Sequence, residues 1–241
     1  MCFPFSVAII DKNTAIPCFH TGCGREVRIY GKPHHQNPVE EWQRAAEGDP
    51  RPFCHQPLPH QLLSGHTTLK TRQSEAELAA QALTQHYVAS TIVDTILCLD
   101  GTQIIGAYLA KELNRAGFIS INAHQTIYVV TPEYDTTSQL IFRDNLVPMI
   151  RDKHVLILTA SVTTGISARK AMECVQYYGG STAGIATIFS DITQVEGVPV
   201  QSIFTKEDVS GYATYSTQEC PLCKHGAKLD ALVNGYGYSK L

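Results

Sequence analysis

Five apolar segments in the middle of the chain alternate with amphipathic ones. The apolar segments are rich in β-branched residues and nearly free of charge, and they span 91–99, 126–130, 154–159, 183–189 and 198–204. Strands that are apolar on both faces are typical of a parallel sheet covered by helices on both sides. The pattern therefore predicts an α/β fold with a mainly parallel sheet of about five strands and flanking helices.

The amphipathic segments around these strands predict three helices. Ser74 and Glu77 have the spacing of a capping box, which marks a helix start. Gly117 is expected to end the second helix as its C′ residue, and a Gly-Gly pair at 179–180 is expected to end the third. The predicted helices span 74–87, 102–116 and 164–178.

The two ends of the chain follow neither pattern. Residues 1–66 are dense in proline, glycine, histidine and cysteine, apart from a strand-like apolar start and a helical stretch at 38–47. The last residues hold a Cys-x-x-Cys sequence and a predicted short helix at 228–233. We therefore divide the chain into an irregular N-terminal cap (1–66), an α/β core (67–205) and a C-terminal tail (206–241), with the first and last forming a small cap on the core.

Composition and charge narrow the possible partners. The 241 residues suffice for one large domain, and 44% hydrophobic with 17% charged residues is an ordinary soluble balance. The formal net charge of −3 gives no long-range attraction for nucleic acid or an anionic membrane. No apolar run approaches the roughly 18 residues of a membrane span, and the amino terminus has no signal-peptide features. We therefore expect a cytoplasmic protein with no nucleic-acid or membrane partner.

The strongest chemical signal is the segment 156–167, LILTASVTTGIS, which has the pattern of a strand, a turn and a helix start. Backbone N–H groups at such a turn point outward, and the partial positive charge of the helix N-terminus favours an anion, so the turn suits a phosphate monoester. Glycine in the turn lets the backbone approach the anion closely. The plainer alternative is a helix N-cap by Thr163 or Thr164. The predicted phosphate-binding residues are Ser161, Thr163, Thr164, Gly165, Ile166 and Ser167.

A second loop lies on the same side of the predicted sheet. The strand at 91–99 ends in Leu99-Asp100-Gly101-Thr102, where the second helix begins. Ligands of parallel sheets sit at the carboxyl ends of the strands, so the amides of Gly101 and Thr102 can bind a second phosphate group or pyrophosphate. Asp100 can engage a metal ion or, in the plainer alternative, cap the helix.

These motifs resemble those of the type I phosphoribosyltransferases, and most closely those of orotate phosphoribosyltransferase-like proteins. The turn at 161–167 is similar to the family's ribose 5-phosphate turn, LLSGHTTLKTR (62–72) to the entrance segment of the orotate enzymes, and 99–113 to their pyrophosphate loop. The resemblance implies Mg²⁺-dependent transfer of a phosphoribosyl group from phosphoribosyl pyrophosphate to a nucleobase, most naturally orotate, by a homodimer. It implies that Asp100 and Lys70 are catalytic, with Lys70 or Arg72 near the acceptor or across a dimer interface. It also implies that Thr159 and Ala160 contact the ribose.

The sequence departs from the family's pattern at two places. Thr159 and Ala160 stand where the family has two acidic residues that hold the ribose hydroxyls. The stretch 129–139 contains no Lys or Arg to hold pyrophosphate, and its Glu133 and Asp135 would repel pyrophosphate unless Mg²⁺ bridges them. Arg143 is a candidate substitute for the missing basic residues. The alternative function is therefore a catalytically decayed nucleotide-binding sensor or regulatory protein on the same fold.

The eight cysteines suggest a structural metal site rather than disulfides, which are rare in the cytoplasm. Zinc needs four nitrogen or sulfur ligands, and a site joining the two chain ends would use Cys18, Cys23, Cys220 and Cys223, with His20 or Cys54 as alternative ligands. Free or buried thiols are the competing interpretation, and a redox pair is a third. Cys98 and Cys174 lie in apolar periodic segments and are expected in the core.

Overall fold

The structure, a computed structural model, divides the chain into two units, each described by itself. One unit comprises Thr68–Phe204, and the other combines Met1–Thr67 with Thr205–Leu241, the two ends of the chain. The residues that the structure describes are 6–9, 18–21, 67–115, 120–123, 125–136, 139–208, 214–216, 229–234 and 237–240.

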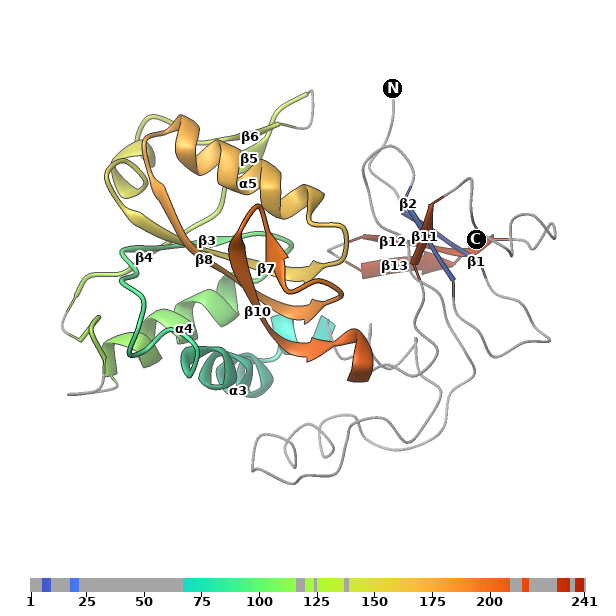
Figure 1. Ribbon diagram of the computed structural model, residues 1–241, viewed down its shortest axis with the longest axis horizontal. Coiled ribbons are helices and arrows are strands. Elements are labelled where there is room, and N and C mark those ends of the chain that lie inside the picture. The colour runs from blue at the N-terminus through green and yellow to red at the C-terminus, as the bar shows by residue number, and fades with distance from the viewer. Residues whose placement is uncertain are drawn as a thin grey trace. The chain divides into compact units, whose positions relative to one another are not determined.

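The larger unit is built on a six-stranded sheet (Figure 1). Its strand order is β4 (Tyr128–Val130), β3 (Thr95–Cys98), β7 (His154–Val162), β8 (Ser181–Ser190), β10 (Val198–Thr205) and β9 (Gln194–Val195). The first four of these strands are parallel neighbours, and β9 pairs antiparallel with β10. The predicted α/β fold with a mainly parallel sheet is therefore confirmed, with one strand more than expected.

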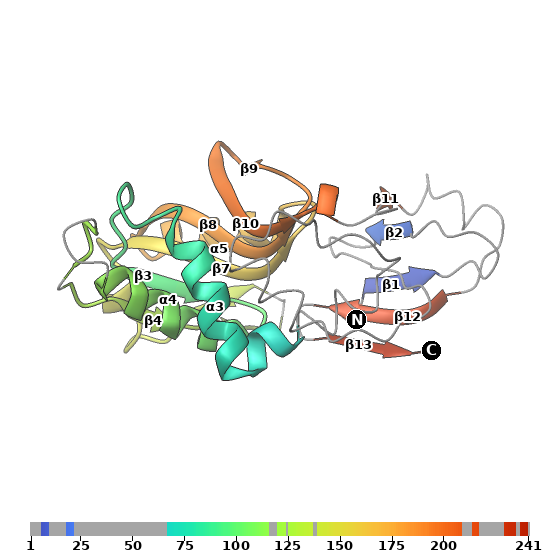
Figure 2. The ribbon, with the colours of Figure 1, turned by 90° about the horizontal axis from the view of Figure 1, so that it is seen from below.

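Helices cover both faces of this sheet. Helices α3 and α4 pack together on one face and α5 lies on the other, as Figures 1 and 2 show. None of the helices in the described ranges is both long and apolar enough to cross a bilayer. The α-helices span Gln73–Thr84 (α3), Gln103–Arg115 (α4) and Ile166–Tyr177 (α5). A helical segment at 67–71 precedes α3, and short 3₁₀ helices lie at Val147–Met149 and Lys206–Asp208.

The three predicted helices are present, but the capping box is wrong. Arg72 occupies the N-cap of α3 without a side-chain cap, so Ser74 lies inside the first turn. The Ser74 hydroxyl donates to the Glu75 carboxylate at 2.8 Å, and Glu77 accepts a hydrogen bond from Gln73. The preceding helical segment shifts the helix start by two residues and leaves no N-cap role for Ser74. Gly117, the predicted stop of α4, lies outside the described residues.

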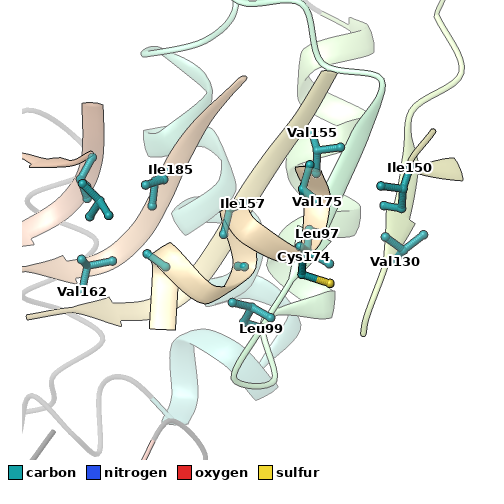
Figure 3. Close-up of a cluster of buried hydrophobic side chains, with 14 of the residues drawn as sticks. Leu97, Leu99, Val130, Ile150, Val155, Ile157, Val162, Cys174, Val175 and Ile185 are labelled. Carbon is teal, nitrogen blue, oxygen red and sulfur yellow. The ribbon is translucent and has the colours of Figure 1, made fainter. Parts of the chain in front are cut away.

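The central strands are buried on both faces because helices pack against each side. Leu97 of β3 and Ile157 of β7 belong to a cluster that includes Cys174 and Val175 of α5 (Figure 3). Cys98 instead lies beneath α4 on the opposite face. The predicted core positions of Cys98 and Cys174 are confirmed, and burial raises the pKa of their thiols to about 12 and about 11, respectively.

Two short hairpins each contain one strand that the sequence pattern did not predict. In the first, β5 (Glu133–Tyr134), in a stretch polar enough to resemble a loop, pairs with the apolar β6 (Leu140–Ile141). In the second, Glu196 and Gly197 have φ angles of 48° and 82° and form the tight turn between β9 and β10. This turn adds the sixth strand, which is too short for a periodic pattern to reveal.

The second unit contains a five-stranded sheet made from both ends of the chain. Its order is β11 (Thr214–Ser216), β2 (Cys18–Thr21), β1 (Ser6–Ile9), β12 (Leu229–Asn234) and β13 (Gly237–Lys240). The strand predicted at the apolar start is confirmed as β1, but the helix predicted at 228–233 is wrong, because these residues pair with β1 and β13. Pairing on both sides overrides the helical propensity of Leu, Ala and Lys there. The helix expected at 38–47 lies outside the described residues.

At the amino-terminal edge of the larger sheet, Asp94 is bound to His154. Its Oδ2 accepts hydrogen bonds from the backbone N–H and the ring Nδ1 of His154, both at 2.8 Å. Burial by itself would raise the pKa of Asp94, but these two hydrogen bonds outweigh it and lower the pKa. The carboxylate therefore stabilises the fold above its ordinary pKa, and that stability is lost as the pH falls through the lowered value.

Asp94→Asn is accordingly expected to lower the free energy of unfolding by about 1–2 kcal/mol at neutral pH. The deficit relative to the wild type should shrink when the pH falls well below about 4, where the wild-type carboxylate also becomes protonated. Urea denaturation at pH 7 and pH 3 measures both values. Asp144→Asn, at an exposed turn residue, is the control and should change little at either pH. An Asp94→Asn deficit of the same size at both pH values would contradict the assigned role.

Candidate functional site

The turn between β7 and α5 has the geometry of an anion-binding turn. β7 ends at Val162, α5 begins at Ile166, and Gly165 occupies the N-cap position with a φ of 75°. No side chain caps the helix, so the plainer alternative of an N-cap by Thr163 or Thr164 does not describe this turn. The N–H groups of the first turn of α5 are therefore left for a ligand or water. Thr164 and Ser167 are exposed beside them, whereas Thr163 is buried.

The loop after β8 holds this turn in place. The Ser190 hydroxyl and the Asp191 N–H both donate to the carbonyl oxygen of Val162, at 3.2 and 2.9 Å. Ile192 and Val195 pack so close to Gly165 that a Cβ atom there would lie 3.2 and 3.0 Å from their side chains. The sequence analysis did not identify this loop, because nothing local in Ser-Asp-Ile marks a contact with a segment 28 residues earlier.

The second loop, after β3, has an unusual backbone. Asp100 and Gly101 both adopt the left-handed region, with φ angles of 54° and 78°. Thr102 holds the loop: its N–H donates to the Leu99 carbonyl at 3.1 Å, and its hydroxyl contacts the carbonyls of Leu99 and Leu158 at 2.8 and 3.1 Å. The N–H and the hydroxyl of Thr102 are thus both used inside the protein. The pyrophosphate contact expected of the Gly101 amide remains a prediction.

Lys70, Asp100 and Thr159 come together at the carboxyl ends of β3 and β7. The Lys70 ammonium donates to the backbone carbonyl of Asp100 at 3.0 Å, and the Thr159 hydroxyl donates to Oδ2 of Asp100 at 2.5 Å. Lys70 is 5% exposed and Thr159 is 1% exposed, so each contact joins a buried side chain to the half-buried Asp100. Ala160, also expected to contact ribose, is 2% exposed. Asp100 is the more accessible member of this cluster.

The β5–β6 hairpin adds no unpaired arginine to the site. Arg143 binds the Glu133 carboxylate through Nη2 and Nε, at 2.5 and 3.0 Å. The hydrogen bond from Arg143 lowers the pKa of Glu133 and raises the pKa of Arg143 itself. Asp135 accepts a hydrogen bond from the Gln139 N–H at 2.8 Å. Arg143 therefore neutralises Glu133 in this structure, and its predicted role as a substitute for the missing basic residues has no support from these contacts.

The predicted zinc ligands fall largely outside the described residues. Cys23, Cys220 and Cys223 lie there, and Cys18 is described only as the first backbone position of β2. Among the residues that the structure does describe, no group of three or more His, Cys, Asp or Glu side chains is placed to hold a metal ion. The zinc site therefore stays a prediction from the sequence.

No family model matches the sequence. The orotate phosphoribosyltransferase of Caldanaerobacter subterraneus subsp. tengcongensis is 38% identical over 81 residues, which is 33% of this chain and 40% of that protein. The orotate phosphoribosyltransferase of Pelotomaculum thermopropionicum is 36% identical over 76 residues, 31% of this chain and 38% of that protein. The chain is similar to orotate phosphoribosyltransferases. The predicted resemblance is thus confirmed, over less than half the length of either relative.

Solved structures of phosphoribosyltransferases also resemble this chain at low sequence identity. An orotate phosphoribosyltransferase of Mycobacterium tuberculosis is 17% identical with a TM-score of 0.42, covering 58% of this chain and 78% of its own. A phosphoribosyltransferase of Corynebacterium diphtheriae is 17% identical with a TM-score of 0.44, covering 72% and 98%.

Proposed function

We propose that this protein is a phosphoribosyltransferase that moves a phosphoribosyl group from phosphoribosyl pyrophosphate to a nucleobase. The similarity to orotate phosphoribosyltransferases makes orotate the first acceptor to test. The observation that carries the proposal is the turn at 163–167, where a left-handed glycine, rather than a capping side chain, precedes α5. On the basis of the same similarity, we also propose that the protein is a homodimer.

The turn suits the 5-phosphate of ribose. The first N–H groups of α5 and the positive end of its dipole act together on an anion, and a phosphate monoester needs no lysine for such a contact. Thr164 and Ser167 are exposed and add hydroxyl donors. Ser161, Thr163 and Ile166 complete the proposed phosphate-binding segment.

The opposite end of the ribose would lie near the β3 loop. Cys98 is paired with Leu158, so the Asp100 loop lies beside Thr159. Thr159 and Thr163 are four residues apart, about 13 Å at the usual rise of a strand, which leaves room for a ribose between the loop and the phosphate turn. Gly101 would face the pyrophosphate, and the ammonium of Lys70 places a positive charge beside the leaving group.

A Mg²⁺ ion fits this arrangement through Asp100. Mg²⁺ in phosphate-transfer sites commonly takes one or two protein carboxylates, and the substrate's phosphate oxygens and water supply the other ligands. The Asp100 carboxylate uses Oδ2 for Thr159, and its Oδ1 makes no hydrogen bond with any described residue. When bound, the ion would supply positive charge that offsets the charge of pyrophosphate.

A second candidate is a sensor that binds a ribose 5-phosphate compound without turnover. Two observations favour it: the end of β7 carries the uncharged Thr159 and Ala160, and Arg143 is bound to Glu133. Such a protein would keep the phosphate turn and lack the groups that stabilise the reacting centre and leaving group.

Release of pyrophosphate from phosphoribosyl pyrophosphate with Mg²⁺ decides between the two functions. We expect release that depends on added orotate, or on another pyrimidine or purine base, and that is lost in Gly165→Ala. Gly197→Ala, a change at the β9–β10 turn where a Cβ atom would meet no atom within 4 Å, is the matched control and should keep the activity. Binding of a ribose 5-phosphate compound without turnover on any common base would support the sensor, and absence of both binding and turnover would contradict both proposals.

A further inference from the structure

Hydrogen bonds hold both the backbone carbonyl and the side-chain carboxylate of Asp100. The buried Lys70 ammonium binds its backbone carbonyl at 3.0 Å, and the buried Thr159 hydroxyl binds its carboxylate at 2.5 Å. The residue has a φ of 54°, in the left-handed region, which non-glycine residues rarely adopt although aspartate tolerates it better than most. The two hydrogen bonds hold both the backbone and the carboxylate of Asp100 in this position.

The accessible acid at this edge comes from β3, not from β7. Thr159 is 1% exposed and its hydroxyl is already donated to Asp100, so it has little surface left for a ligand. Asp100 is half-buried, and its Oδ1 makes no hydrogen bond with any described residue. A hydrogen bond from a buried hydroxyl to one carboxylate oxygen fixes the direction of the other. Thr159 therefore acts through Asp100 and not by direct contact.

We propose that Thr159 is a positioning residue that aims the Asp100 carboxylate at the ribose of the bound substrate. Oδ1 of Asp100 has two lone pairs: one accepts a hydrogen bond from a ribose hydroxyl, the other stays available to Mg²⁺, and the carboxylate lies on the side of the anomeric carbon. Breaking the bond from that carbon to the pyrophosphate oxygen leaves the electron pair on the oxygen and develops positive charge on the sugar, which a nearby fixed carboxylate stabilises. The inference rests on the proposed function, since it concerns the same site.

Lys70 has a supporting part in this arrangement. Its ammonium donates a charge-assisted hydrogen bond to the carbonyl oxygen of Asp100 in a partly buried position. Together with the Thr102 contacts to Leu99 and Leu158, this fixes the left-handed loop independently of Thr159. Removing the Thr159 hydroxyl should therefore free the carboxylate without collapsing the loop.

The test compares two ligands on one set of variants by calorimetric titration. Inorganic phosphate probes the turn alone, whereas ribose 5-phosphate adds the ring hydroxyls. Thr159→Val and Asp100→Asn are expected to reduce the affinity for ribose 5-phosphate relative to phosphate by about tenfold, the loss of one charge-assisted hydrogen bond. Thr159→Ser keeps the hydroxyl and should restore the wild-type ratio. In pyrophosphate release, Thr159→Val should lower kcat by a larger factor than it raises KM.

The possible failures are distinguishable. If the wild type binds neither phosphate nor ribose 5-phosphate, the proposed function itself is wrong and the inference falls with it. If the wild type binds ribose 5-phosphate and both Asp100→Asn and Thr159→Val keep the wild-type affinity ratio, only the inference is overturned. Binding of inorganic phosphate by each variant shows that its turn is intact, and Asp100→Asn tests the carboxylate even if Thr159→Val does not fold.

Discussion

Alanine at Gly165 is expected to weaken ribose 5-phosphate binding at least about tenfold and to lower the free energy of unfolding by about 2–4 kcal/mol. Gly165 has a φ of 75°, a region that costs a residue with a Cβ atom about 1–2 kcal/mol. The new Cβ would also lie 3.0 Å from Val195 Cγ2 and 3.2 Å from Ile192 Cδ1. Relief of both strains must move the turn, and its N–H groups then no longer converge on one anion.

Gly197→Ala separates the effect of backbone strain from the effect of the close contacts. Gly197 has a φ of 82°, and a Cβ atom there would meet no atom within 4 Å. It therefore pays the same backbone cost of about 1–2 kcal/mol without the close contacts and should leave ligand binding unchanged. Urea denaturation and calorimetric titration of both variants give the comparison. Equal losses of stability, or normal ligand binding by Gly165→Ala, would show that the contacts with Ile192 and Val195 do not shape the turn.

Alanine at Gly106 is expected to destabilise the larger unit by about 1–3 kcal/mol, the usual range for overpacking a core. A Cβ atom there would lie 2.4 Å from the Sγ of Cys98 and 3.3 Å from Val129 Cγ1. Cys98 is fully buried beneath α4. The overpacking should exceed the gain of up to about 1 kcal/mol that alanine brings over glycine in a helix interior.

A double-mutant cycle with Cys98→Ala identifies the clash as the cause. Cys98→Ala removes the sulfur and leaves a small void, which the methyl group of Gly106→Ala can fill. The double variant should therefore be more stable than the sum of the two single changes predicts, by about 1 kcal/mol or more. Additive losses in urea denaturation would mean that α4 is free to shift away from the sheet and that Gly106 does not set their separation.

The sequence predicted those parts of the fold that are encoded locally. β3, β7 and β8 appear as continuous apolar segments because helices bury both of their faces. The short strand β9 and the β5–β6 hairpin have too few residues for a period to register. The segment 228–233 was predicted as a helix because its propensity is helical, but pairing with β1 and β13 decides its conformation.

In the candidate site, too, the locally encoded feature was predictable and the long-range contacts were not. The phosphate turn was predictable because strand, glycine and helix start lie within one short segment. The contacts of Asp100 were not predictable, because Lys70 and Thr159 are 30 and 59 residues away in the sequence. Only the parallel register of β3 with β7 makes Thr159 a neighbour of Asp100. A residue that seemed from the sequence to be a lost carboxylate thus becomes, in the structure, the partner of another carboxylate.

We propose that the turn at 163–167 binds the 5-phosphate of a ribose. Calorimetric titration of the wild-type protein with ribose 5-phosphate and with unphosphorylated ribose tests this binding. We expect ribose 5-phosphate to bind at one site per chain and ribose to give no measurable binding, because the turn recognises the phosphate. Absence of binding by ribose 5-phosphate, or equal binding of the two sugars, would contradict the account.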